Sequence, residues 1–396
     1  NNVAIGGLAL TANTTANSNA AFGYSALADN TTGTLNVAIG TNALANNTTA
    51  SDNTAVGTNA LFDSTTGTRL VAVGKDALAN NTTGVDNVAV GRLALRDVTT
   101  SSNNVAMGTN ALVLNTASNN TALGSYSLNA NTTGAENTAV GRNTLDANTT
   151  ASGNTAVGYN SLGANTTGDR NVAIGSGALD SNTVGDRSVA VGYHALTTQN
   201  PSSNTDMYNT AVGHSALAAN TTGIQNTSVG ALALDANTTG NYSTAVGVGA
   251  LGNATTSTLS TMLGYAAGNA ITTGSKNTII GSYNGNQNGL DIRTSNNNIV
   301  LSDGDGNPRV DINEDVFVHI DHKHSPTIIV EYDGHKTASS GGGTATFNLD
   351  WSLNTAFSTL SGWIAEVFVH CDFGANGAPN NGNRWQSFDV AVAQTI

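Results

Sequence analysis

The chain has 396 residues, of which only 10% are charged, and its formal net charge is −13 at pH 7. This acidic balance argues against a nucleic-acid-binding surface and against attachment to an anionic membrane. The single cysteine, Cys371, excludes an intrachain disulfide, and no apolar run approaches membrane-spanning length. The low charge and the abundance of Asn, Thr, Ser and Gly favour an extended extracellular structure over a cytoplasmic enzyme.

A short motif that ends in glycine recurs along most of the chain. Its closing glycine falls at positions 6, 23, 40, 57, 74, 91, 108, 124, 141, 158, 175, 192, 213, 230, 247, 264 and 281. Fourteen of the sixteen intervals are 17 residues, one is 16, and the interval from Gly192 to Gly213 is 21. A fixed period of this kind predicts stacked coils that tolerate insertions only outside their strands. We therefore expect a surface loop around Pro201 and an undisturbed register on both sides of it.

Each copy contains one short strand. Three residues before the closing glycine stands Val or Thr in all but one copy, and the residue directly before it is always apolar; Ala and Asn fill most of the alternate positions. Because strand side chains alternate, these residues form two uncharged faces, which is typical of a strand covered on both sides. A leucine four residues after the glycine, from Leu10 to Leu251, supplies a second core anchor.

These features predict a β-solenoid shaft. Seventeen coils at a strand spacing of about 4.8 Å make a rod of about 80 Å, with Asn over Asn and Thr over Thr in hydrogen-bonded ladders. The NTT triplets match an N-glycosylation acceptor, but we interpret them as turns. One coil encloses too little volume to bury both faces of its strand. We therefore expect the alanine face to meet another chain at close approach, in a parallel homotrimer.

The expected fold class is all-β: a trimeric β-solenoid (parallel β-roll) shaft over residues 1–285, neck hairpins over 286–325, and a small antiparallel β-sandwich tip over 326–396. Within the neck, SDGDGNP (302–308) alternates the oxygen ligands Asp303, Asp305 and Asn307, as a calcium loop does. No bidentate acid follows at the proper spacing, so we interpret this segment as a tight turn.

The tip has long strands and two glycine-rich loops, 333–343 and 372–384, which are candidates for contacting a receptor. The alternative is that they are solvated connections. The candidate receptor-contact residues are Asp333, His335, Lys336, Asn376, Asn380, Asn381 and Arg384. No nucleophile motif, phosphate-binding loop or paired-carboxylate motif is evident, so we expect neither catalytic nor cofactor-binding residues. The alternative is a depolymerase with acids on the shaft surface.

The repeat resembles two families. The Asn-x-Ala-Val/Ile-Gly strands look like the left-handed β-roll heads of trimeric autotransporter adhesins. The full unit NTAVGxxALxANTTGxx, with GLDIRTSNNNIVLSDGDGNPRVDI (289–312) after it, resembles tail fibres of tailed bacteriophages, especially those of marine and cyanobacterial phages. The resemblance covers roughly residues 1–315. It implies a virion tail fibre that binds a host-cell glycan or protein and joins the tail or baseplate through an N-terminal part outside this sequence. A bacterial surface adhesin or extracellular filament is the alternative.

HIDHKHS places His319, His322 and His324 within six residues. In a strand His322 and His324 share one side, so three chains around an axis present six imidazoles, enough for an octahedral ion such as iron, nickel or zinc. The His-x-His pair also resembles metal-binding pairs at the needle-like tips of some phage fibres. The alternative is a polar, solvent-facing linker.

Overall fold

The structure, a computed structural model, describes residues 1–312, 316–321 and 327–332. The chain divides into two units, residues 1–334 and 335–396, and all described residues belong to the first. The β-sandwich expected at 326–396 lies outside the described residues beyond Tyr332.

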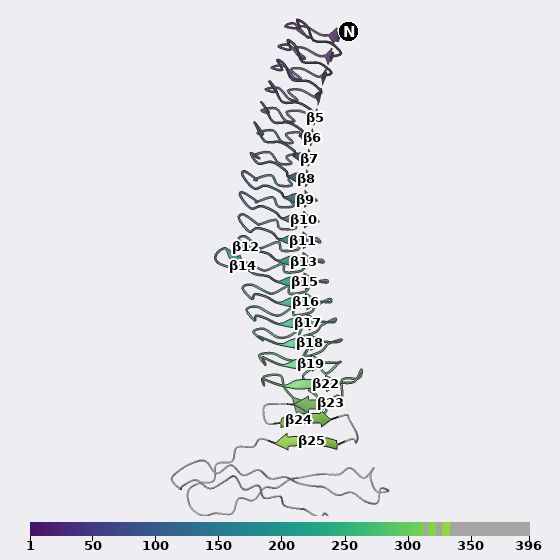
Figure 1. Cartoon of the computed structure of the whole chain (residues 1–396), viewed down its shortest axis with the longest axis vertical. Coiled ribbons are helices and arrows are strands. Elements are labelled where there is room, and N and C mark those ends of the chain that lie inside the picture. The colour runs from purple at the N-terminus through teal and green to yellow at the C-terminus, as the bar shows by residue number, and fades with distance from the viewer. Residues whose placement is uncertain (313–315, 322–326, 333–396) are drawn as a thin grey trace, which may run out of the picture. The chain divides into compact units, whose positions relative to one another are not determined.

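The first unit is a parallel β-solenoid in which strands three residues long stack one above another (Figure 1). Each pairs in register with the strand one coil away, for example Thr155↔Val172 and Ala156↔Ala173. The parallel β-solenoid expected for the shaft is confirmed. The stacked strands are β1 (Val3–Ile5), β2 (Ala20–Phe22), β3 (Val37–Ile39), β4 (Thr54–Val56), β5 (Val71–Val73), β6 (Val88–Val90), β7 (Val105–Met107), β8 (Thr121–Leu123), β9 (Thr138–Val140), β10 (Thr155–Val157), β11 (Val172–Ile174), β13 (Val189–Val191), β15 (Thr210–Val212), β16 (Thr227–Val229), β17 (Thr244–Val246), β18 (Thr261–Leu263) and β19 (Thr278–Ile280).

The core of most coils combines one alanine and one leucine. Ala38, at the centre of β3, and Leu44, four residues after the closing glycine, are both fully buried, and the coils of β2 to β17 follow the same plan, with Ser228 in place of the alanine in β16. Leu44 has φ 50°, in the left-handed region that costs an ordinary residue about 1–2 kcal/mol. The leucine column repeats this conformation, which turns the chain so that each leucine points inward. Burial of the leucine offsets the backbone cost.

The closing glycines hold neighbouring coils at close approach. Gly158 has φ 134°, and a Cβ built on it would lie 2.7 Å from the carbonyl carbon of Gly175 in the next coil. No other residue fits there, because both the backbone conformation and the space exclude a side chain. The repeated glycine therefore sets the strand-to-strand distance where the chain leaves the sheet.

Two buried asparagine ladders tie the coils together. The first ladder lies directly before the strands. In it, Asn137 Oδ1 accepts a hydrogen bond from the backbone N–H of Asn154 at 3.0 Å, and Asn137 Nδ2 donates to the carbonyl of Ala151 at 2.8 Å. In the turn, Asn148 Nδ2 donates to Asn131 Oδ1 at 2.7 Å. Outside them, threonine hydroxyls donate to carbonyls one coil away. The predicted Asn and Thr ladders are confirmed, and they satisfy buried polar groups that the narrow core cannot cover.

The insertion between Gly192 and Gly213 leaves the register intact, as predicted, because Ala190 pairs with Ala211. It contains β14 (Thr205–Asp206), which pairs in parallel with β12 (Gly185–Asp186) of the preceding coil, and Figure 1 shows it projecting from the stack. Residues 202–204 are exposed. Pro201 itself is buried, contrary to its expected place at the centre of a surface loop, and packs with Met207 over Gly185. Relative to the preceding coil, three extra residues protrude and one, Met207, forms a buried bulge.

The solenoid ends in coils with a different core and in hairpins. β20 (Asn286–Gln287) and β21 (Leu290–Asp291) form one antiparallel pair, and β22 (Ile299–Ser302) and β23 (Pro308–Ile312) form another. β22 also pairs in parallel with β19, so the shaft sheet continues beyond residue 285, into the segment expected to be neck alone. β24 (Val316–Asp321) and β25 (Thr327–Tyr332) form a further antiparallel pair.

Candidate assembly surface

One face of the stacked sheet points away from the coil and carries an apolar column along its length. The residue before each closing glycine lies on it, and Ile39, Ile174 and Leu263 are 42%, 40% and 48% exposed. Register pairing places these residues directly over one another, as in Val157↔Ile174. We call this column, with the Val and Thr column two residues earlier on the same face, the outer strand face.

The outer strand face carries no charged side chain from β1 to β19. Its side chains are half-buried or exposed in the single chain. Monomeric proteins rarely leave a continuous apolar surface of this extent to water, so such a surface marks an interaction site.

The expectation that the alanine face meets another chain is wrong. The strand alanines, such as Ala139 and Ala156, are fully buried inside the coil of their own chain. A 17-residue coil encloses enough volume for this face because the leucine beside it is turned inward by its left-handed backbone. The face left uncovered by the single chain is therefore the one that carries Val, Ile and Thr.

Larger side chains flank the outer strand face in the coils of β17 and β18. Tyr242 and Leu259 stand two residues before their strands and are 48% and 55% exposed, while Val248 and Tyr265 directly follow the closing glycines and are 49% and 71% exposed. These residues were not predicted from the sequence, although their fixed spacing from the closing glycine is a signal that identifies them.

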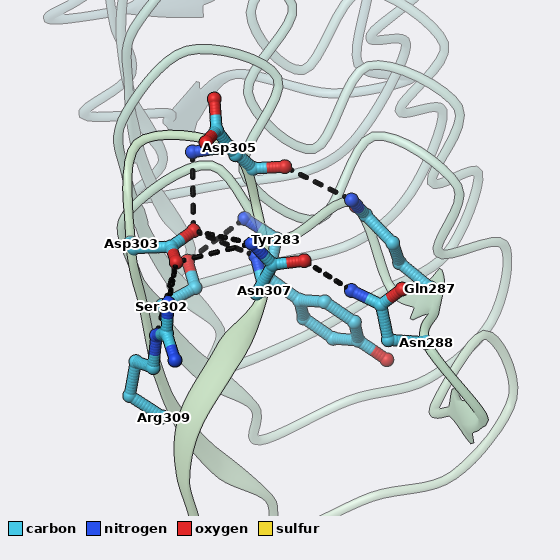
Figure 2. A network of polar contacts seen from close by, with 8 residues as sticks. All are labelled: Tyr283, Gln287, Asn288, Ser302, Asp303, Asp305, Asn307 and Arg309. Carbon is cyan, nitrogen blue, oxygen red and sulfur yellow. Dashed lines mark hydrogen bonds and ion pairs between the residues drawn. The ribbon is translucent and has the colours of Figure 1, made fainter.

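The segment 302–308 is a tight turn around Asp303 (Figure 2). The Asp303 carboxylate accepts hydrogen bonds from Asn307 N at 2.9 Å and from Asp305 N at 3.1 Å, and Arg309 Nε donates to its other oxygen at 2.9 Å. The Asn307 side chain and backbone, followed by Arg309, lower the pKa of Asp303 to about 2. This carboxylate is committed to donors of its own chain. The tight-turn interpretation is confirmed, and the calcium-loop alternative loses its central ligand.

Tyr283 closes the core beside this turn. Its side chain is fully buried, its hydroxyl donates to the carbonyl of Leu290 at 2.8 Å, and its backbone N–H donates to Ser302 Oγ at 2.9 Å. Burial, followed by the charges of Asp311 and Asp291, raises the pKa of the Tyr283 phenol. Tyr283 therefore acts as a neutral structural donor that joins the last coil to the hairpins.

The asparagines of the NTT triplets are not accessible for N-glycosylation in the folded coil. In the NTT triplets at residues 30–32 and 148–150 the asparagine is fully buried and its Nδ2 bonds to a carbonyl within its own turn. A glycan on such an asparagine is incompatible with the folded coil, so the interpretation of these triplets as turns is confirmed.

Most of the other predicted site residues fall outside the described residues. His319 lies in β24, opposite Ile329 of β25. His322 and His324, predicted to bind a metal at the trimer axis, and the predicted receptor-contact residues lie outside the described segments; the latter are Asp333, His335, Lys336, Asn376, Asn380, Asn381 and Arg384. Within the described segments, no group of three or more His, Cys, Asp or Glu side chains is placed to hold a metal ion. The same residues include no helix long and apolar enough to cross a membrane.

Comparison of the chain with protein-family models, with curated proteins and with solved structures finds no match.

Proposed function

We propose that the chain is the shaft and tip of a homotrimeric, extracellular receptor-binding fibre, and specifically a tail fibre of a tailed bacteriophage. The outer strand face is the observation that carries this proposal. A solenoid coil that buries its own alanine and leucine does not need an apolar outer face for folding. In this proposal, a second and a third copy of the chain cover that face in the assembled fibre.

Three copies suit this surface because it is a narrow column that runs parallel to the stack axis. Three such columns can meet around one axis in a closed, parallel arrangement, which leaves the Asn-rich and Thr-rich turns outside. Parallel copies place all three tips at one end and all three N-termini at the other, as a fibre with one attached end and one free end requires. The stacked coils supply a length of about 80 Å between the two ends.

The resemblance of the 17-residue unit to phage tail fibres supports the assignment to a virion. In this proposal the N-terminal side joins the tail or baseplate, and the region after residue 325 contacts a host glycan or protein. We assign no catalytic step to the shaft. A bacterial surface adhesin is the second candidate, because the Asn-x-Ala-Val/Ile-Gly strands also resemble adhesin heads. The segment that precedes this sequence distinguishes the two: a virion-docking domain supports the fibre, and a secretion signal supports the adhesin.

Native mass measurement of the purified chain tests the assembly. We expect a homotrimer, and a stable folded monomer would contradict the proposal. Truncation after Ser325 then tests the place of recognition: the truncated shaft should remain trimeric and lose binding to host cells. Retained binding by a correctly assembled truncation would move recognition to the shaft.

A further inference from the structure

Coils near the middle of the shaft carry a connected group of aromatic and polar side chains beside the outer strand face. Both histidines that precede β24 in the sequence, His194 and His214, contact one tyrosine. The Tyr193 ring stacks on His214 with centroids 5.3 Å apart and an interplanar angle of 19°, and it meets His194 edge-on at 4.1 Å. Tyr193 nevertheless remains 53% exposed. Its contacts therefore fix the ring without covering it.

A second fixed ring lies in the same column two coils away. Tyr159, like Tyr193, directly follows a closing glycine; it is 53% exposed, and the Arg142 guanidinium lies 6.0 Å from the centre of its ring. Two coil spacings separate the backbones of Tyr159 and Tyr193 by about 10 Å along the shaft. The two rings form platforms that follow the shaft axis, with only Ser176 in this column between them.

Hydrogen-bonding groups connect the two platforms. Asn160, next to Tyr159, donates through Nδ2 to the Asp180 carboxylate. Gly163 adds no side chain here: a Cβ built on it would meet Asn160 Oδ1 at 2.8 Å and Asp180 Oδ1 at 3.1 Å. His194 covers Gly177 of the preceding coil, and its Nδ1 lies 3.2 Å from Thr197 Oγ1.

A second carboxylate stands on the other side of this glycine. Asp146 occupies the position of Gly163 one coil earlier, and its Oδ1 is buried without a hydrogen-bond partner among the described residues. Burial raises the pKa values of both Asp146 and Asp180. Asp146 and Asp180 thus lie one coil before and one coil after Gly163, and the half-buried Asp180 carboxylate can accept a further hydrogen bond from a hydroxyl donor.

We propose that Arg142, Tyr159, Asn160, Asp180, Tyr193 and His214 form a lateral binding strip for a neutral oligosaccharide that lies along the shaft. Sugar rings present apolar C–H faces to exposed aromatic rings, and their hydroxyl groups donate to carboxylates and amides. The strip pairs two ring platforms with such acceptors at the coil spacing. Arg142 offsets one of the two carboxylates, so the strip has no net basic character that favours a polyanion. This site rests on the proposed fibre function and adds a sugar-binding site on the shaft to receptor recognition at the tip.

Binding of the assembled full chain to immobilised polysaccharides tests the strip. The probes are dextran, laminarin, mannan and a panel of neutral bacterial O-polysaccharides, with hyaluronan as the anionic comparison. We expect the native protein to bind at least one neutral probe, and Tyr193→Ala and Tyr159→Ala each to weaken that binding about tenfold. Tyr24→Ala is the matched control, because Tyr24 occupies the same column far from the strip and is 57% exposed; it should leave binding unchanged.

Three outcomes overturn the strip: no neutral probe is bound, only hyaluronan is bound, or all three tyrosine variants weaken binding equally. Native mass measurement of each variant separates this result from the fibre proposal. If Tyr193→Ala dissociates the trimer, the ring belongs to the chain-to-chain interface and the strip is wrong while the fibre stands. If the native chain is a monomer that still binds through Tyr193, the fibre is wrong and the strip stands.

Discussion

The sulphur of Met262 occupies the space that a side chain on Gly268 would need: a Cβ built there would lie 2.9 Å from Met262 Sδ. In the preceding coil the corresponding residues are Ala245 and Leu251, both fully buried. The two coils fill the same volume in opposite ways. The earlier coil has a small residue in the strand and a large one after the glycine, and the later coil has a large residue in the strand and glycine at the second position. The loss of the leucine anchor is therefore an exchange of volumes inside a continuous solenoid.

This exchange predicts strong coupling between the two positions. Gly268→Leu alone should destabilise the shaft by about 1–3 kcal/mol through overpacking, and Met262→Ala alone by about 2–5 kcal/mol through a cavity. The double variant should recover most of both losses, because it restores the alanine and leucine pair. Thermal unfolding of the four proteins measures the coupling. Additive losses would show that the two side chains do not share one space.

The turn ladder of asparagines is broken at Ser64, and this break predicts a stabilising substitution. Ser64 is fully buried, and its Oγ, like Asn47 Oδ1 in the preceding coil, lacks a hydrogen-bond partner among the described residues. In the intact part of the ladder, each asparagine donates to the one before it, as Asn148 does to Asn131. Ser64→Asn should restore this contact and raise the free energy of unfolding by about 1 kcal/mol.

Asn165→Ser is the matched control for the ladder, because it creates the same defect where Asn165 now donates to Asn148 and accepts from Asn182. It should lower the unfolding free energy by about 1–3 kcal/mol, since buried amide groups lose their partners. Opposite signs for the two variants in chemical denaturation support the ladder. A neutral or destabilising Ser64→Asn would contradict it.

Charge placed on the outer strand face should prevent assembly. Ile174→Asp puts a carboxylate on a residue that is 40% exposed in the single chain and central in the proposed trimer. Burying three such charges around one axis costs far more than the apolar contact provides, so we expect a monomer in native mass measurement. Thr167→Asp, on an exposed turn in the preceding coil, should stay trimeric. A trimeric Ile174→Asp variant would place the interface elsewhere.

The effect of pH on stability should differ between Asp186 and Asp303. Burial raises the pKa of Asp186; the hydrogen bond from Asp169 N–H and the charge of Arg187 oppose this rise, and the carboxylates of Asp169 and Asp206 add to it. The ionised form is therefore the less favourable one in the fold, and this penalty disappears as the pH falls through the raised pKa towards the unfolded value. Asp186→Asn should stabilise the shaft at pH 7 and lose that advantage in acid. Its Oδ1 can still accept from Asp169 N, as Asn241 Oδ1 does from Ile224 N at 2.7 Å.

Asp303 provides the opposite sign as a comparison. Its pKa of about 2 lies below the ordinary value of 3.8, so its ionised form stabilises the turn above about pH 4. That contribution is lost as the pH falls towards 2. Asp303→Asn should therefore destabilise the chain at pH 7 and matter less in strong acid. Unfolding midpoints of both variants between pH 2 and pH 7 check the two signs, and parallel pH profiles would contradict them.

The sequence predicted the coil, the strand positions, the leucine anchors and the ladders, because each recurs at a fixed spacing. It did not predict which strand face points inward. Both faces are uncharged, and the inward face is set by the left-handed backbone at each leucine. Leucine disfavours this conformation, and no local sequence pattern predicts it. The aromatic strip was missed for another reason: Tyr159 and Tyr193 lie 34 positions apart in sequence and become neighbours in one column only after the coils stack.

The division of the insertion into a protrusion and a bulge predicts two different deletion results. Residues 202–204 are exposed, and Gly185 pairs with Thr205 directly after them, so their removal should leave the unfolding midpoint nearly unchanged. Met207 is fully buried, its backbone N–H donates to Asp186 at 3.1 Å, and its carbonyl accepts from Gln225 N at 2.7 Å. Additional deletion of Met207 removes a core side chain and should lower the midpoint by several degrees. If the smaller deletion is as damaging as the larger one, the protruding residues support the stack and the assigned register is wrong.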